Sequence, residues 1–306
     1  MKGFYPEGYK NKPLLKKTAY TPSYLAESKI REEILEAVAL LCDEEHNIIV
    51  DLGGMKGVIP RCEGAIGIAE GVTRDIAMLS RVGKNVCFCV EDLKTDQNGN
   101  CYAVLSRRKA QEKFKEWFFK NVTVGDIIPA KVTHLEPFGA FCDIGCGVVS
   151  LLPIDSISVS RISHPQDRFK TGDDIFVVVK DIAPDGKITV SHKELLGTWQ
   201  ENADMFSWGQ TVSGVIRSVE EYGVCVELTP NLAGLAEPCA TAKVGDCASV
   251  YIKSILPEKM KIKLIIIDTF STKPLKETMY FKKEGHINSF CYSPKVCNKK
   301  METFFI

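Results

Sequence analysis

Two phenylalanines, Phe138 and Phe141, flank a Gly-Ala pair in the stretch HLEPFGAFCDIG (134–145), which otherwise alternates like a strand. Strand side chains alternate between two faces, so residues three apart point in opposite directions. Parity then directs Phe141 outward and Phe138 inward, where it would plug one end of a barrel. A bulge at Gly139 would instead expose both rings, and exposed paired aromatics are typical of a surface that binds a partner. The residues alone leave both arrangements open.

Signatures of catalysis and of metal binding are missing from the sequence. It has no H-E-x-x-H pair, no Walker loop, and no Ser/His/Asp or paired-carboxylate arrangement in a plausible setting. Its twelve cysteines include no C-x-x-C pair, so we expect reduced, packed thiols rather than a metal site. The sequence therefore predicts a protein that is not an enzyme and that uses no cofactor and no metal.

Composition narrows the class of protein further. The 306 residues are 45% hydrophobic and 25% charged, which is ordinary for a globular protein of two or three domains. The formal net charge is zero, so any binding of nucleic acid must come from a local surface. The first residues lack the apolar run of a signal peptide, and no apolar stretch is long enough to span a membrane. We expect a cytoplasmic protein without membrane contact.

An internal repeat sets the domain organisation. Residues 124–153 align without a gap on residues 208–237, which places Phe138 on Tyr222. Further on, residues 177–190 match residues 249–264, which places Lys180 on Lys253 and, after a one-residue slip, Lys187 on Lys261. A weaker copy starts near residue 34 and keeps neither phenylalanine. Each copy has about five short β-rich runs with a longer third-to-fourth connection, which predicts a small closed barrel. Apolar residues at helical spacing predict short helices between the copies.

The F-G-A-F-x-D-x-G pattern at 138–145, together with the rest of residues 122–192, resembles the S1-type RNA-binding domain, a five-stranded OB-fold barrel. From about residue 30 to residue 268 the chain resembles the short multi-module relatives of bacterial ribosomal protein S1 from low-GC Gram-positive bacteria. The resemblance implies a mainly β fold of tandem five-stranded OB-fold barrels joined by short helices. Pro153 and Ala183 depart from the family, which often has a histidine and an aspartate there.

The resemblance implies that the two rings stack on RNA bases and that a lysine opening the fifth strand contacts the backbone. Glu237 stands at the histidine position of the third copy, where it should weaken the approach of a phosphate. Basic residues of the loop 160–172 could widen the footprint, although a simply solvated loop is the alternative. The candidate RNA-binding residues are His134, Phe138, Phe141, Arg161, His164, Arg168 and Lys187 in the second copy, and Tyr222, Lys253 and Lys261 in the third.

The expected organisation has three barrels, two linkers and two terminal segments. The boundaries are an N-terminal arm at 1–30, a divergent S1-like barrel at 31–110, a helical linker at 111–121, an S1-type barrel at 122–192, a second helical linker at 193–207, an S1-type barrel at 208–268, and a basic C-terminal tail at 269–306. We expect the arm and the tail to touch RNA, to dock on a barrel or to be partly disordered.

The resemblance implies non-enzymatic binding of single-stranded RNA, including mRNA, in translation at the small (30S) ribosomal subunit. Two alternatives stay open: an RNA-turnover or post-transcriptional regulatory factor, and a protein-interaction scaffold whose barrels no longer bind RNA. Because only the first copy lacks stacking rings, we expect it to contact protein while the other two bind RNA. We expect a monomer.

Overall fold

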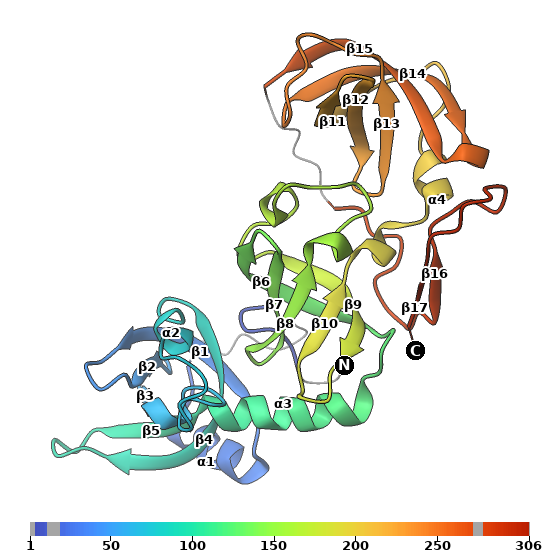
Figure 1. Ribbon diagram of the computed structural model, residues 1–306. Helices are drawn as coiled ribbons and strands as arrows, with labels where there is room; N and C mark the ends of the chain where they lie inside the picture. Colours follow the sequence, from blue (N-terminus) through green and yellow to red (C-terminus); the bar gives the residue numbers. More distant parts are fainter. Residues whose placement is uncertain (1–3, 11–18, 272–277, 306) are drawn as a thin grey trace. The chain divides into compact units, whose positions relative to one another are not determined.

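The computed structural model describes residues 4–10, 19–271 and 278–305. Residues 1–3 and 11–18 of the expected arm, and 272–277 and 306 of the expected tail, lie outside this part. Three closed five-stranded barrels are present (Figure 1), so the prediction of a mainly β fold of tandem barrels is confirmed. The chain forms two compact units, one of residues 1–122, 129–131 and 143–149, the other of residues 123–128, 132–142 and 150–306.

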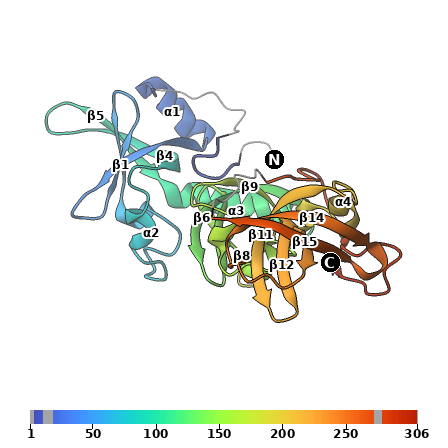
Figure 2. The same ribbon diagram turned by 90° about the horizontal axis from the view of Figure 1, so that it is seen from above.

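The first barrel has the strand order β1-β2-β3-β5-β4. Its strands are β1 (Leu35–Cys42), β2 (Ile48–Asp51), β3 (Lys56–Ile59), β4 (Asn85–Thr95) and β5 (Cys101–Ser106), and short helices η1 (Arg61–Glu63) and α2 (Ile76–Leu79) lie between β3 and β4. Helix α1 (Pro22–Arg31) packs against this barrel through the fully buried Leu25 (Figure 2). Thr21 starts this helix, because its side chain accepts a hydrogen bond from the backbone of Tyr24.

Helix α3 (Arg107–Asn121) follows the first barrel directly. The linker was expected at 111–121, but the helix begins four residues earlier because Ser106 caps it through the backbone N–H of Lys109. Ala110, Phe114 and Phe118 are buried and four residues apart, so they form one apolar face of the helix.

The second and third barrels repeat the same five-strand plan. Their strands are β6 (Ile127–Glu136), β7 (Gly139–Gly145), β8 (Val148–Pro153), β9 (Asp174–Ile182) and β10 (Ile188–Ser191), then β11 (Thr211–Glu220), β12 (Gly223–Thr229), β13 (Leu232–Ala236), β14 (Cys247–Leu256) and β15 (Lys261–Phe270). Short 3₁₀ helices lie in the loops between strands: η2 (Ile154–Ser156) and η3 (Pro165–Asp167) between β8 and β9, and η5 (Pro257–Lys259) between β14 and β15. In both barrels the fifth strand pairs in parallel with the third, which closes the sheet.

The linker between these two barrels contains two short helices. Gly197, with φ of +83°, separates the 3₁₀ helix η4 (Lys193–Leu196) from α4 (Trp199–Ala203). The described part of the C-terminal tail returns to this linker and forms a hairpin of β16 (Ser289–Cys291) and β17 (Glu302–Phe304) beside it (Figure 1). The backbone N–H of Trp199 donates to the carbonyl of Tyr292 at 2.9 Å, which fastens the hairpin to the linker.

Other sequence expectations concern thiols, metals and membranes. All twelve cysteines are free thiols, and six of them, including Cys87 and Cys142, are buried. Within the described residues no three His, Cys, Asp or Glu side chains gather as a metal site would need. None of the helices in the described part of the chain combines the length and the hydropathy that a membrane span requires.

Candidate nucleic-acid interface

Phe138 lies in the turn between β6 and β7, because β6 ends at Glu136 and β7 begins at Gly139. Strand alternation therefore does not apply to it, and its exposure needs no bulge at Gly139. Phe138 is 55% exposed. Its ring meets the half-buried Phe141 edge to face, with centroids 6.0 Å apart, and His134 stacks on Phe141 at 6.4 Å. Three aromatic rings from β6, the turn and β7 thus form one surface, which we call the ring surface.

Gly139 fixes this turn against β8. A Cβ added there would lie 2.4 Å from the carbonyl oxygen of Leu152, while the N–H of Ile154 donates to the carbonyl of Phe138 at 3.0 Å. Only a residue without a side chain allows the two backbones to approach so closely.

We expect Gly139→Ala to lower the free energy of unfolding by about 2 kcal/mol, because the added methyl group must push β7 away from β8. Urea denaturation of the full chain measures this loss. An unchanged midpoint would mean that the two strands separate there without cost.

Strand register places the basic residues of the two repeats at equivalent points. Thr189 pairs with Leu151 in the second barrel, and Lys263 pairs with Leu235 in the third. At the fifth strand of each barrel, Lys187 lies two residues before Thr189 and Lys261 lies two residues before Lys263. The repeat alignment predicted this equivalence of the two lysines. Both are exposed, and Lys187 forms an ion pair with Asp185 at 2.7 Å.

Two lysines that the candidate set missed also belong to these surfaces. Lys180 on β9 donates to the hydroxyl of Ser156 at 3.1 Å. Ser156 lies two residues after Ile154, whose N–H donates to the carbonyl of Phe138. The repeat alignment pairs Lys180 with the candidate Lys253, so the signal was present. Lys263 is exposed on β15, and alternation from Lys261 could have identified it.

The third barrel keeps one exposed ring. Tyr222 is 74% exposed in the turn between β11 and β12, the position of Phe138 in the second barrel. The residue corresponding to Phe141 is Cys225, which is half-buried. Lys253 lies 3.5 Å from the carboxylate of Glu237, which partly neutralises it. This surface therefore offers one stacking ring and lysines, with a carboxylate among them.

The first barrel carries aliphatic residues in the equivalent row. Ile49 pairs with Val58, and Val58 pairs with Val104. In the third barrel the equivalent pairs are Cys225 with Leu235 and Leu235 with Lys263. Tyr102, two residues before Val104, takes the position of the lysines at the start of the fifth strand. The row therefore provides neither an exposed phenylalanine nor a lysine for RNA.

Arg168 requires a correction, because it does not lie on an accessible surface. Its side chain is 8% exposed and its guanidinium forms an ion pair with Glu227, which Arg217 also contacts at 2.7 Å. Burial with a carboxylate partner removes Arg168 from contact with a phosphate. The residue instead joins the loop 160–172 to the third barrel.

The other two candidates of this loop lie apart from the ring surface. His164 is half-buried, and its Nδ1 accepts the backbone N–H of Gln166 and so starts the turn η3. Arg161 is exposed beside the C-terminal hairpin, where it lines a groove. The structure thus brings together His134, Phe138 and Phe141, but not the whole candidate set.

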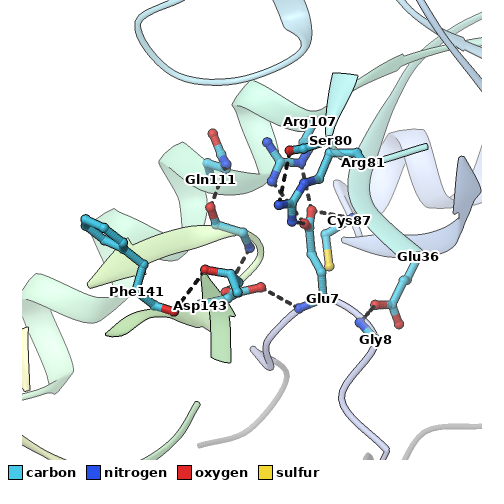
Figure 3. A network of polar contacts seen from close by, with 12 residues as sticks. Glu7, Gly8, Glu36, Ser80, Arg81, Cys87, Arg107, Gln111, Phe141 and Asp143 are labelled. Carbon is cyan, nitrogen blue, oxygen red and sulfur yellow. Dashed lines mark hydrogen bonds and ion pairs between the residues drawn. The ribbon is translucent and has the colours of Figure 1, made fainter. Parts of the chain in front are cut away.

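Strand alternation would direct Asp143, two residues after Phe141, to the outer face of β7, but Asp143 is 1% exposed. The backbone N–H of Glu7 donates to its carboxylate (Figure 3). The backbone N–H groups of Gly145 and Gly147 donate to it as well. Glu7 in turn forms a two-pronged ion pair with the buried Arg107, at 2.7 and 2.9 Å. The described residues of the N-terminal arm therefore cover the end of β7, and Glu7 pairs with the buried charge of Arg107.

Comparison with known proteins identifies what the chain is similar to. Residues 121–193 match the family model of the S1 RNA binding domain. The chain is 29% identical over 247 residues to the small ribosomal subunit protein bS1 of Leuconostoc lactis, which covers 75% of this chain and 55% of that protein. It is 28% identical over 273 residues to the bS1 of Staphylococcus aureus (strain COL), covering 84% of this chain and 67% of that protein.

The chain thus spans little more than half the length of the Leuconostoc relative. A crystal structure of a multidomain protein with nucleic acid binding domains from Streptococcus pneumoniae TIGR4 aligns with 81% of this chain and with 75% of the Streptococcus chain. The sequence identity is 13% and the TM-score is 0.25, which is too low to support an inference. The resemblance seen in the sequence is confirmed: residues 121–193 match the S1 RNA binding domain, in a chain similar over most of its length to small ribosomal subunit proteins bS1.

Proposed function

We propose that the chain binds single-stranded RNA, including mRNA, at the small ribosomal subunit, without catalysis. The ring surface of His134, Phe138 and Phe141, exposed on an S1 RNA-binding domain, is the observation that carries this proposal. The names of the bS1 relatives support a place on the small subunit, and with it a cytoplasmic location. The prediction of a monomer stays a prediction.

The physical basis is stacking beside positive charge. Each base that stacks on an aromatic side chain contributes about 1–3 kcal/mol, and every base has a face that can stack. Lys180 and Lys187 contact the backbone phosphates of an RNA strand whose bases stack on the rings. A single surface of this size binds weakly, and a second linked surface at Tyr222 raises affinity by avidity.

The division of labour between barrels is part of the proposal. The third barrel binds RNA more weakly than the second, because it keeps one ring and places Glu237 beside Lys253. The first barrel contacts protein instead, and Val38, Leu40 and Leu41 of β1 support this role because all three are more than 40% exposed.

We expect the double variant Phe138→Ala/Phe141→Ala to bind single-stranded RNA about 30-fold more weakly, since it loses stacking worth about 2 kcal/mol. Fluorescence anisotropy with a labelled oligonucleotide across a salt series measures this. The salt slope should stay the same, because no phosphate contact is removed. Phe119→Ala, which removes an exposed phenylalanine from α3, is the control and should bind like the wild type.

Unchanged affinity in a folded double variant would contradict stacking and favour the protein-interaction scaffold. Sedimentation with purified small subunits separates the remaining alternative. A chain that binds RNA through Phe138 and Phe141 but does not sediment with the subunit would be a turnover or regulatory factor.

A further inference from the structure

A groove of about 440 Å³ lies between the second barrel and the C-terminal hairpin. One wall is the segment from Ile154 to Ile162 with Lys193, and the other consists of residues of β16, β17 and their flanks. This volume suits one small organic group, such as a nucleotide. Neither the repeat nor the S1 domain match assigns a role to the hairpin, because it lies beyond residue 270.

One backbone hydrogen bond joins the groove lining to the ring surface. Ile154, at its edge, donates its backbone N–H to the carbonyl of Phe138. The hairpin wall is fixed in place by two hydrogen bonds of Tyr292, whose carbonyl accepts from Trp199 and whose hydroxyl donates to the carbonyl of Asn231. A strand that leaves Phe138 can therefore continue into a preformed groove.

The lining has the groups that a nucleotide requires. Arg161 is exposed and has no ion-pair partner among the described residues. Lys193 uses one ammonium proton on the carbonyl of Asp155 at 3.1 Å, which leaves two donors for a phosphate. Phe290 is half-buried in the wall and offers a ring for stacking.

Two carboxylates, from Asp155 and Glu302, also line the groove and bring its formal charge to zero. A purely anionic ligand would meet repulsion from both. A nucleotide suits the mixture better, because its phosphate pairs with the cations while the amino group of a base donates to a carboxylate. The chemistry therefore favours a nucleotide of RNA over an isolated phosphate or an acidic peptide.

We propose that this groove is a second RNA subsite, which holds a nucleotide of the same strand that stacks on Phe138 and Phe141. Arg161 and Lys193 bind the phosphate and Phe290 stacks on the base. The proposal rests on the proposed function, since it extends the RNA site of the second barrel. The C-terminal hairpin thus acts as a clamp that lengthens the footprint of one S1 domain.

The test uses the full chain and two labelled RNA oligonucleotides, of about four and about twelve nucleotides, both within the range of about 4–16 nucleotides that one OB fold occupies. We expect Arg161→Glu to weaken binding of the longer oligonucleotide about tenfold and to reduce its salt slope by about 0.7. The shorter one, held by the rings alone, should bind unchanged. Lys299→Glu makes the same change of charge on the exposed surface of the hairpin, outside the groove, and is the control.

A photocrosslink provides an independent readout. The longer oligonucleotide with a thiouridine at one end should crosslink to the peptide that contains Phe290, and Arg161→Glu should abolish the crosslink. If RNA binding depends on Phe138 and Phe141 but Arg161→Glu behaves like Lys299→Glu, the groove proposal is overturned and the proposed function stands. If the wild-type chain binds neither oligonucleotide, the proposed function fails and the groove proposal fails with it.

Discussion

Replacing Arg107 by alanine should lower the free energy of unfolding of the first compact unit by about 3–5 kcal/mol, the usual loss when one partner of a buried ion pair is removed. Arg107 is 3% exposed and bonds both carboxylate oxygens of Glu7 and the carbonyl of Gly64. Burial alone raises the pKa of Glu7, but the charge of Arg107 reverses this and holds the pKa below its usual range. Without the guanidinium, the carboxylate of Glu7 keeps only the hydrogen bond from the backbone N–H of Cys87 at 3.0 Å and the contact with Arg81 at 3.4 Å.

The neighbouring Arg108 is a matched control for this prediction. It follows Arg107 on α3 and also contacts carboxylates, Glu63 and Glu112, but its side chain is 35% exposed. Solvent weakens such pairs, so Arg108→Ala should cost at most about 1 kcal/mol. Urea denaturation combined with hydrogen exchange of β4 and β5 amides measures both variants in the full chain. Equal losses for the two arginines would contradict the role of burial.

Acidification should destabilise the second compact unit through His192. This residue is 1% exposed, and burial lowers its pKa to about 4. Its neutral ring donates from Nδ1 to the carbonyl of Ile157 at 3.0 Å and accepts at Nε2 from the hydroxyl of Tyr280 at 3.1 Å. An unfolded histidine has a pKa of about 6.5, so the unfolded chain takes up this proton first as pH falls. The contribution is fully present above pH of about 6.5 and is lost as pH falls to about 4.

The shift corresponds to about 3 kcal/mol over this window. Denaturation midpoints at a series of pH values measure the loss in the wild type. Carboxylates titrate in the same range, so the informative quantity is the difference from His192→Gln, whose profile should be flatter by about this amount. His164→Gln, at a half-buried histidine of the loop 160–172, should keep the wild-type profile. Identical profiles for both variants would mean that His192 does not cause the pH dependence.

The sequence by itself determined the barrels, their number and their aromatic residues. These features depend on alternation within short strands and on a gap-free repeat, which are local properties of the chain. The equivalence of Lys187 and Lys261 came from a second stretch of the repeat after a one-residue slip, and strand register agrees with it. Exposure of Phe138 was left open because it depends on where β7 begins. The structure decided it by placing this residue in a turn.

Only the tertiary structure decided which charged residues are accessible. Asp143 is covered by Glu7, which is 136 residues away in the chain, and Arg168 is paired with Glu227, 59 residues away. The groove beside Arg161 forms because the C-terminal hairpin returns to the linker through Tyr292 and Trp199. Local sequence patterns specify strands. Whether a charged side chain is buried depends on which distant segment packs over it, and no local pattern of the sequence reveals that contact.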